Sequence, residues 1–163
     1  MRDSLEWLVK DEMAMSGFGQ NLAETLLPRD FVLLEGELGA GKTFLVRAAA
    51  RALGVTESEP VTSPTFGLVH EYQGSYSIVH SDLYRVGRAE ELDELGLPEL
   101  LESDAISFVE WGRDFLDSLR SPDLCIEISF TAPEARRVCV SAGTPRGAQI
   151  LGALSVALEP GTC

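Results

Sequence analysis

Apolar residues in the first third of the chain follow two spacings, which together predict a strand between two helices. One helical stripe is apolar at every fourth position, at Phe18, Leu22 and Leu26. Pro28 predicts the end of this helix. Residues 31–34 then form an uninterrupted apolar run, as is typical of a strand covered on both faces in a parallel sheet. A second helical stripe covers residues 45–53, so residues 30–54 predict a strand, a loop and a helix.

The middle of the chain predicts a hairpin followed by a broken acidic helix. Residues 62–72 and 75–82 are rich in β-branched and aromatic side chains, and they flank Gln73-Gly74, which favours a hairpin turn. Residues 89–102 have the pattern of an acidic helix that a glycine and a proline interrupt.

The last third continues the alternation of strands and helices. Residues 105–109 predict another buried strand, and residues 113–119 a short helix. Alternating apolar residues predict strands over residues 124–130 and 138–140, each with one apolar face. Residues 145–158 predict a helix, because a threonine N-cap and a first-turn proline come at its start. The pattern as a whole predicts the α/β class with a mixed sheet.

Length and composition limit the chain to one ordinary globular domain. It has 163 residues, of which 45% are hydrophobic and 24% charged. We expect a single domain over residues 1–163, with a core over about 18–142 and a C-terminal helix over about 145–158. No apolar stretch is long enough for a membrane span, and the acidic N-terminus is unlike a secretory signal. A cytoplasmic location without membrane contact is therefore expected.

The net charge of −13 argues against strong direct binding of nucleic acid, which needs a basic face to neutralise phosphates. Nearly half of this charge lies in residues 82–104. This segment contains eight acidic residues and only two basic ones, Arg85 and Arg88, for a net charge of −6. Such a segment is either a solvated helix face or a docking surface for a basic partner. The three cysteines have no spacing that is typical of a disulfide framework or a zinc site.

One motif predicts chemistry directly: residues 36–43 (GELGAGKT) match the phosphate-loop pattern G-x-x-x-x-G-K-[ST], between a predicted strand and a predicted helix. Glycines let the main chain fold tightly around a triphosphate, and the N-terminus of the next helix points free N–H groups at its oxygens. Lys42 is placed for the β- and γ-phosphates, and Thr43 offers a hydroxyl to Mg²⁺. The expected fold is therefore a P-loop NTPase-like three-layer α/β fold with a mainly parallel sheet, and the expected cofactors are ATP and Mg²⁺.

Two acidic residues at predicted strand ends are candidates for the metal and the attacking water. Glu110 follows the apolar strand of residues 105–109, and Asp82 ends the strand of residues 75–82. Ligands in open α/β sheets bind at the carboxyl ends of strands, so we expect one acid to meet the metal and the other to orient water.

Four further residues near these motifs have open roles. Thr65 is either a γ-phosphate-sensing hydroxyl or part of an ordinary proline turn. Trp111 either lies against the nucleotide, faces a partner or packs in the core. His70 and His80 lack metal-ligand spacing, and we expect both to be structural or hydrogen-bonding.

Several motifs in fixed order go beyond a generic phosphate loop. After the loop come SPTF (63–66), HSDLYR (80–85), LDELGL (92–97) and Glu110-Trp111. Over residues 18–119 this pattern resembles the bacterial TsaE (YjeE) family. The resemblance implies a P-loop ATPase required for threonylcarbamoyl (t6A) modification of the adenosine 3′ of the anticodon, in tRNAs that read codons beginning with A. It also implies that TsaD and TsaB are partners and that hydrolysis is weak without them.

Carried over by position, the resemblance implies roles for individual residues. Mg²⁺ would lie on Thr43 and Glu110, and Asp82 would act with Lys42 in catalysis. Trp111 and the Thr65 segment would lie close to the nucleotide. The expected ATP contacts are Leu38, Gly39, Ala40, Gly41, Lys42 and Thr43.

The sequence departs from the family pattern at three places. Met15 stands where Thr or Ser is common near the nucleotide, so that polar contact is either missing or supplied by Ser16. Ser81 replaces a bulkier apolar residue, and Gly112 replaces a proline.

Two other functions stay open from the sequence. A small-molecule P-loop kinase has a similar length, although the expected lid region is acidic here. The other is a nucleotide-binding scaffold, in which the bound nucleotide matters for function and its hydrolysis does not.

Overall fold

A computed structural model describes residues 4–64 and 68–159 of the chain. In these residues a seven-stranded sheet has the order β1-β7-β6-β2-β5-β4-β3. Strands β2, β4, β5 and β6 are mutually parallel, whereas β3 and β7 run the opposite way at either side of them, and β1 pairs antiparallel with β7. The strands are β1 (Ser4–Val9), β2 (Phe31–Glu35), β3 (Val69–Gln73), β4 (Ser77–Asp82), β5 (Ile106–Glu110), β6 (Leu124–Phe130) and β7 (Arg136–Ala142).

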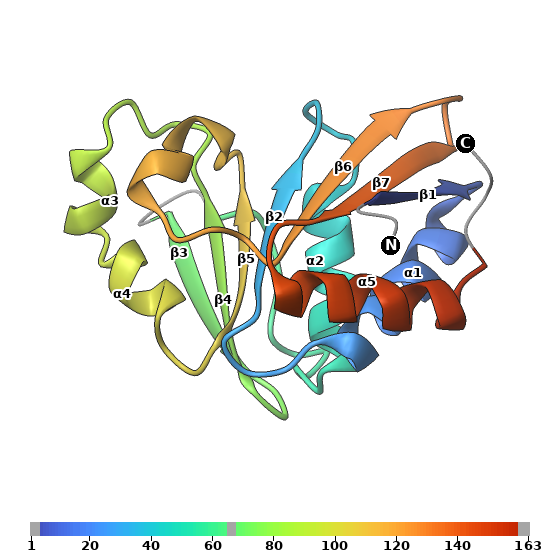
Figure 1. The fold of residues 1–163 in the computed structure, drawn as a ribbon, viewed down its shortest axis with the longest axis horizontal. Helices are drawn as coiled ribbons and strands as arrows, with labels where there is room; N and C mark the ends of the chain where they lie inside the picture. Colours follow the sequence, from blue (N-terminus) through green and yellow to red (C-terminus); the bar gives the residue numbers. More distant parts are fainter. Residues whose placement is uncertain (1–3, 65–67, 160–163) are drawn as a thin grey trace.

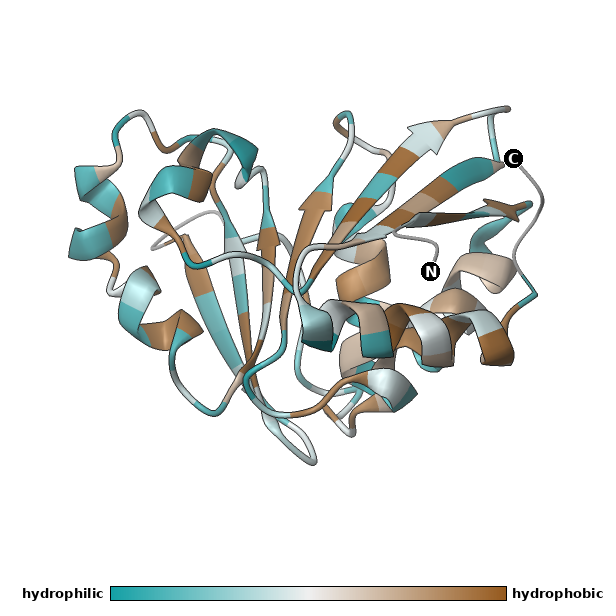
Figure 2. Cartoon of the chain, in the orientation of Figure 1, coloured by the Kyte–Doolittle hydropathy of each residue, from teal (hydrophilic) through white to brown (hydrophobic). Residues whose placement is uncertain are grey.

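Helices cover both faces of the sheet, which gives three layers (Figure 1). One face packs against three longer helices, α1 (Glu12–Thr25), α2 (Lys42–Ala52) and α5 (Pro145–Ala157). The other face packs against α3 (Glu90–Glu94), α4 (Leu97–Leu101) and the 3₁₀ helix η1 (Arg113–Ser118). Figure 2 shows the hydrophobic residues concentrated on the central strands between these layers. The mixed, mainly parallel α/β fold expected from the sequence is confirmed.

The apolar runs form the centre of the sheet, as predicted. Phe31 to Leu34 of β2 are buried, as are all five residues of β5. Strand β2 pairs in parallel with both β5 and β6, so its two edges and both faces are covered. Helix α5 begins as expected, because the Thr144 side chain accepts a hydrogen bond from the Gly147 amide at 3.0 Å.

Several local expectations were wrong in detail. Helix α1 does end just before Pro28, at Thr25 with Leu26 as its C-cap, but residues 62–64 are not part of a strand. The short helix after β5 is a 3₁₀ helix. Phe130 lies beyond the buried part of β6, with 45% exposure, and the Arg136 guanidinium covers its ring at 4.1 Å.

Strand β1 was not predicted. It extends the sheet beyond β7, and the Trp7 indole donates a hydrogen bond to the Leu158 carbonyl at 3.1 Å. The sheet therefore begins at Ser4, well before the predicted core boundary near residue 18. No helix in the described part of the chain is long and apolar enough to cross a membrane.

Candidate nucleotide-binding site

The phosphate loop lies between the end of β2 and the start of α2, at the edge of the sheet where the parallel strands end (Figure 1). Gly36, Gly39 and Gly41 all have positive φ, at 149°, 80° and 113°. A Cβ on Gly36 would also collide with the Ile128 carbonyl. Glycine avoids the backbone strain at all three positions and the clash at position 36.

Main-chain N–H groups in this loop are available to a ligand. The amides of Gly39, Gly41, Lys42 and Thr43 donate to no backbone acceptor among the residues that the structure describes. The last two belong to the first turn of α2, where a helix leaves its amides unpaired and carries a partial positive charge. This is the chemistry of an anion cradle.

The Lys42 ammonium lies under the same loop. It donates hydrogen bonds to the Gly36 carbonyl and, at 3.0 Å, to the Glu37 carbonyl. It also lies 4.2 Å from the centre of the Trp111 ring. Burial lowers the pKa of Lys42, while Glu110, Asp82 and Glu35 oppose this effect. The cation is thus held in a partly dehydrated place close to three carboxylates.

Thr43 and Glu110 are brought together from two different elements. The Thr43 hydroxyl, in the first turn of α2, lies 3.0 Å from each carboxylate oxygen of Glu110 at the end of β5. Glu110 is only 2% exposed. Behind it, the Nε2 atom of His80 lies 2.5 Å from Oε2 of Glu110.

Asp82 lies beside Glu110, because β4 and β5 are parallel and these two residues are register partners. Both of its carboxylate oxygens have donors. The Ser63 hydroxyl donates to Oδ2, and the Tyr84 amide donates to Oδ1 at 2.9 Å. These contacts fix the carboxylate at the rim of the loop.

These side chains line one cleft of about 290 Å³. Eight residues singled out from the sequence line it: Leu38, Gly39, Gly41, Lys42, Thr43, Asp82, Glu110 and Trp111. Phe44 and Ser63, which were not singled out, line it as well. Ala40 is buried and is not among the residues lining this cleft. Thr65 lies outside the described residues, so its predicted role is not placed.

Trp111 closes one side of the cleft in an unusual backbone conformation. Its φ is 59°, in the left-handed region that a non-glycine residue adopts at a cost of about 1 kcal/mol. The ring packs on Tyr84, with 4.9 Å between ring centres, and on the Lys42 ammonium. Of the three roles left open for Trp111, this geometry favours contact with the cleft.

A second cleft of about 200 Å³ opens on the other side of the loop. It is lined by Met15, Phe44 and Arg136, by the loop residues 39–41, and by three acidic residues, Asp11, Glu12 and Glu134. Met15 thus lies beside the loop, where its thioether side chain supplies an apolar wall. Ser16 is not among the residues that line this cleft, so the expected polar contact is not replaced from there.

The other two departures from the family pattern lie close by and have local effects. The buried Ser81 donates a hydrogen bond to the Leu68 carbonyl at 2.9 Å, which ties β4 to the start of β3. A Cβ on Gly112 would come within 2.6 Å of the Leu33 side chain, so the chain passes close to β2 here.

The donor set fits Mg²⁺ better than a metal held by protein alone. The described residues contain no group of three or more His, Cys, Asp or Glu side chains that could hold a metal ion. A hydroxyl and one carboxylate are what Mg²⁺ takes from a protein when phosphates and water complete its coordination. The residues present therefore fit an ion that arrives with a nucleotide.

One contributor to this site, Ser63, was missed from the sequence, where it stood only within a motif. His80 was expected to be structural or hydrogen-bonding, and its contact with Glu110 confirms a hydrogen-bonding role, although the sequence did not indicate the partner. The alternation along β4 was an available signal for His80, because it puts His80 and Asp82 on one face of the strand. Nothing local in the sequence indicated that Ser63 reaches Asp82.

A parallel sheet with this loop between β2 and α2, and with strand-end carboxylates beside it, defines the class as a P-loop α/β protein. Comparison with known proteins narrows the class. The sequence model of the TsaE family, described as threonylcarbamoyl adenosine biosynthesis protein TsaE, matches residues 9–138. The chain therefore belongs to the TsaE family.

Individual relatives agree with this assignment. A protein from Haemophilus influenzae named tRNA threonylcarbamoyladenosine biosynthesis protein TsaE is 35% identical over 159 residues, covering 94% of this chain and 99% of its own. A Bacillus subtilis protein of the same name is 32% identical, with 85% of each chain covered. The crystal structure of Bacillus subtilis YdiB superposes with a TM-score of 0.80 at 26% identity, over 96% of this chain and 97% of that one.

Proposed function

We propose that the protein binds ATP with Mg²⁺ and hydrolyses it in the cytoplasm, weakly alone and faster with TsaD and TsaB, to support t6A modification of tRNA. The TsaE family assignment supports the pathway. One observation supports the chemistry most directly. The Thr43 hydroxyl at the start of α2 contacts Glu110 at the end of β5, in the same cleft as Lys42 and Asp82.

Phosphate binding falls to the loop and to Lys42. The unpaired amides of Gly39, Gly41, Lys42 and Thr43 surround the place where phosphate oxygens would lie. The Lys42 ammonium would exchange its bonds to the carbonyls of Gly36 and Glu37 for the β- and γ-phosphates. The lowering of its pKa by burial does not prevent this, because nearby phosphates favour the charged form.

Thr43 and Glu110 would hold Mg²⁺, directly or through water. The ion, when bound, would neutralise charge on the phosphates during transfer. Asp82 is the proposed group that positions the attacking water, since Ser63 and Tyr84 hold its carboxylate in one orientation.

The nucleoside would occupy the second cleft, on the far side of the loop from Asp82. Met15 and Phe44 provide apolar surface for a base, and Arg136 provides a cation. The Arg136 guanidinium donates to the Ala40 carbonyl at 2.9 Å, so this wall of the cleft is tied to the phosphate loop.

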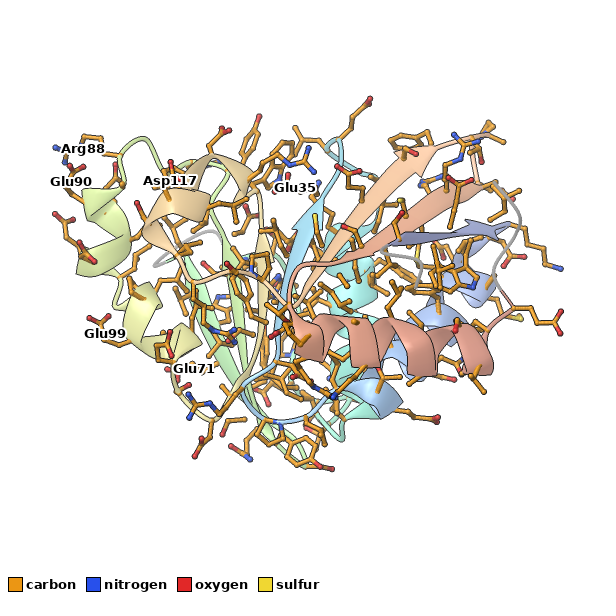
Figure 3. All side chains as sticks on the ribbon, viewed as in Figure 1. Glu35, Glu71, Arg88, Glu90, Glu99 and Asp117 are labelled. Carbon is orange, nitrogen blue, oxygen red and sulfur yellow. The ribbon has the colours of Figure 1, made fainter. Side chains whose placement is uncertain are left out.

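A protein partner that stimulates hydrolysis would contact the exposed residues at the opening of the first cleft. Leu38 and Tyr84 are exposed there, at 64% and 52%, beside residues that would touch ATP. The acidic segment of residues 82–104 continues from this mouth, and Figure 3 shows Glu90 on α3 and Glu99 on α4 pointing away from the sheet. A basic partner surface would complement this face.

Titration calorimetry with Mg·ATP and phosphate-release assays test the proposal. We expect wild type to bind Mg·ATP and to release phosphate slowly, with stimulation by TsaD and TsaB but not by small-molecule acceptors. Asp82→Asn should still bind but lose on the order of 100-fold in stimulated turnover. Glu24→Gln, an exposed change on α1 outside the acidic segment, is the matched control. Absence of heat with well-folded protein contradicts the proposal, and turnover with a small acceptor would support a kinase instead. A nucleotide-binding scaffold would be supported if Asp82→Asn bound ATP but still supported t6A formation.

Charge reversal tests the acidic face. Glu91 is a poor choice, because its carboxylate accepts from the Gly87 amide at 3.3 Å and pairs with Arg88 at 3.9 Å. Glu90 and Asp93 are exposed and make no such contacts in the described structure. Glu90→Lys with Asp93→Lys should weaken capture of the partner pair at least about tenfold, and unchanged capture would assign this face to solvent.

A further inference from the structure

His80 is a fully buried histidine beside a proposed metal ligand. Its exposure is 0%, on β4 between β5 and the edge strand β3. Its Nε2 atom meets Glu110, whereas Nδ1 is buried and has no hydrogen-bond partner among the described residues. A half-satisfied imidazole in a core costs stability relative to an apolar side chain of similar size. The residue therefore needs an explanation other than packing.

The two oxygens of Glu110 are not equivalent. Oε2 contacts both His80, at 2.5 Å, and the Thr43 hydroxyl, at 3.0 Å. Among the described residues, Oε1 contacts only the Thr43 hydroxyl, also at 3.0 Å. A carboxylate has only acceptors, so the imidazole supplies the proton from Nε2. The contact with His80 fixes the rotation of the carboxylate and leaves Oε1 as its less engaged oxygen.

We propose that His80 is a positioning residue for Glu110: by holding Oε2 from behind, it presents Oε1 to Mg²⁺ or to a water on that ion. This inference rests on the proposed function. The β4–β5 pairing makes the arrangement possible, because Asp82 is the register partner of Glu110 and His80 lies two residues earlier on the same face of β4. Hydrogen bonds to metal-bound carboxylates from behind tune metal affinity in proteins generally.

The test separates metal-dependent from metal-independent binding. A nonhydrolysable ATP analogue is titrated into wild type with Mg²⁺ and, separately, with a chelator. We expect Mg²⁺ to tighten binding to wild type. In His80→Met, which fills the space without a donor, this gain should shrink by about 10- to 100-fold, while binding in chelator stays unchanged. His80→Gln carries an amide N–H on a side chain of similar reach and should recover most of the gain.

Ser107→Ala is the matched control. Ser107 is also fully buried, and its hydroxyl has no partner among the described residues. It lies on β5 three residues before Glu110, so its side chain points to the opposite face of the sheet. This variant should keep the whole effect of Mg²⁺, which shows that a change in buried polarity alone does not alter metal binding.

The outcomes distinguish failure of the proposed metal site from failure of the role proposed for His80. No effect of Mg²⁺ on wild type overturns the proposed metal site itself. An effect of Mg²⁺ that is equal in wild type, His80→Met and His80→Gln overturns only the role of His80. Should His80→Met fail to fold, the imidazole Nε2–H resonance of wild type decides. It should shift when Mg²⁺ is added to the analogue complex, and an unmoved resonance overturns the inference.

Discussion

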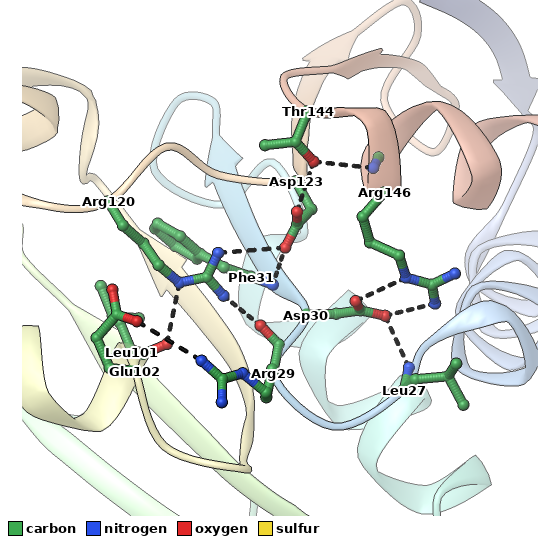
Figure 4. Close-up of polar contacts among 11 residues, drawn as sticks. Leu27, Arg29, Asp30, Phe31, Leu101, Glu102, Arg120, Asp123, Thr144 and Arg146 are labelled. Atoms are coloured by element: carbon green, nitrogen blue, oxygen red, sulfur yellow. Dashed lines mark hydrogen bonds and ion pairs between the residues drawn. The ribbon is translucent and has the colours of Figure 1, made fainter.

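Charged residues gather at both ends of the central strands, but they do different things there. At the carboxyl ends, the phosphate loop leaves main-chain amides unpaired, and Glu110 leaves one oxygen lightly engaged. At the amino ends, the charged groups satisfy one another (Figure 4). Asp30 accepts from the Arg146 guanidinium at 2.8 and 2.7 Å and from the Leu27 amide at 2.7 Å.

Asp123 completes the network at the amino ends and joins three elements. Its carboxylate accepts from the Phe31 amide of β2 at 2.9 Å and from the Thr144 hydroxyl before α5 at 2.6 Å. The Arg120 guanidinium lies 3.4 Å away and also donates to the Leu101 carbonyl. A cleft of about 420 Å³ is lined by these groups. The buried carboxylates of Asp30 and Asp123 both accept hydrogen bonds from other residues of the chain, so we infer that this end of the sheet stabilises the fold.

The difference between the two ends shows how a binding site can be distinguished from a structural network that contains the same residue types. Arginine and aspartate in closed networks satisfy each other, whereas a binding site keeps donors and acceptors for a ligand. Variants at the two ends should therefore change different measurements. Four changes test this separation, in order of expected effect.

The largest effect is expected for Lys42→Met. ATP affinity should fall on the order of 1,000-fold, because the cation that meets the phosphates is removed. The free energy of unfolding should rise by roughly 0.5–1 kcal/mol, because a dehydrated ammonium is replaced by an apolar group. Calorimetry and urea unfolding measure the two quantities.

The pH dependence sharpens this prediction. Burial lowers the folded-state pKa of Lys42 below 10.5, so the folded protein releases this proton at lower pH than the unfolded chain. Wild type should therefore gain stability relative to Lys42→Met as the pH rises through the lowered pKa towards 10.5. Lys10→Met, at the exposed second lysine, is the control and should change neither quantity. A large loss of stability in Lys42→Met would contradict the separation.

Asp123→Ala should act in the opposite way. Removing this carboxylate leaves the Phe31 amide without its acceptor and takes from the Arg120 guanidinium its charged partner, so that only the carbonyls of Leu101 and Arg29 remain to it, at a cost of about 3 kcal/mol. The affinity of the folded protein for ATP should not change. Glu102→Gln, in an exposed ion pair with Arg29, is the control and should stay within about 0.5 kcal/mol of wild type. Weaker ATP binding by folded Asp123→Ala would show that the two ends are coupled.

Thr144→Ala should have a smaller effect at the same end. It removes the N-cap of α5 and one donor to Asp123, for about 1 kcal/mol. Thr144→Ser keeps the hydroxyl and should restore most of this stability in urea unfolding. Equal losses in both variants would mean that the methyl group, and not the cap, matters.

Glu35→Gln should have the smallest effect, visible only through pH. Burial raises the pKa of Glu35 above 4.5, and the Arg113 amide at 2.9 Å partly offsets this. Wild type therefore loses stability relative to the variant as the pH rises through the folded-state pKa. We expect the two proteins to be equally stable at pH 4 and to differ by a few tenths of a kcal/mol at pH 7.5. The opposite sign would contradict the burial argument.

Sequence reasoning located much of the fold and the centre of the candidate site. The phosphate loop and the two strand-end acids could be found because each is a local pattern next to an apolar run. Strand β1 was missed because its partner, β7, follows more than 100 residues later, as the pairing of Ser4 with Ser141 shows. Ser63 was missed because its partner, Asp82, comes 19 residues later, at the end of the β3–β4 hairpin.

Most of the helices and strands, the phosphate cradle and the types of ligand atom could be predicted, because these depend on residues close together along the chain. The folded chain was needed to show which strand ends meet, how His80 contacts Glu110, and that the aspartates and arginines at the amino ends of the strands pair with one another. Strand register and side-chain contact depend on pairing between distant segments, and periodicity along one segment does not carry that information.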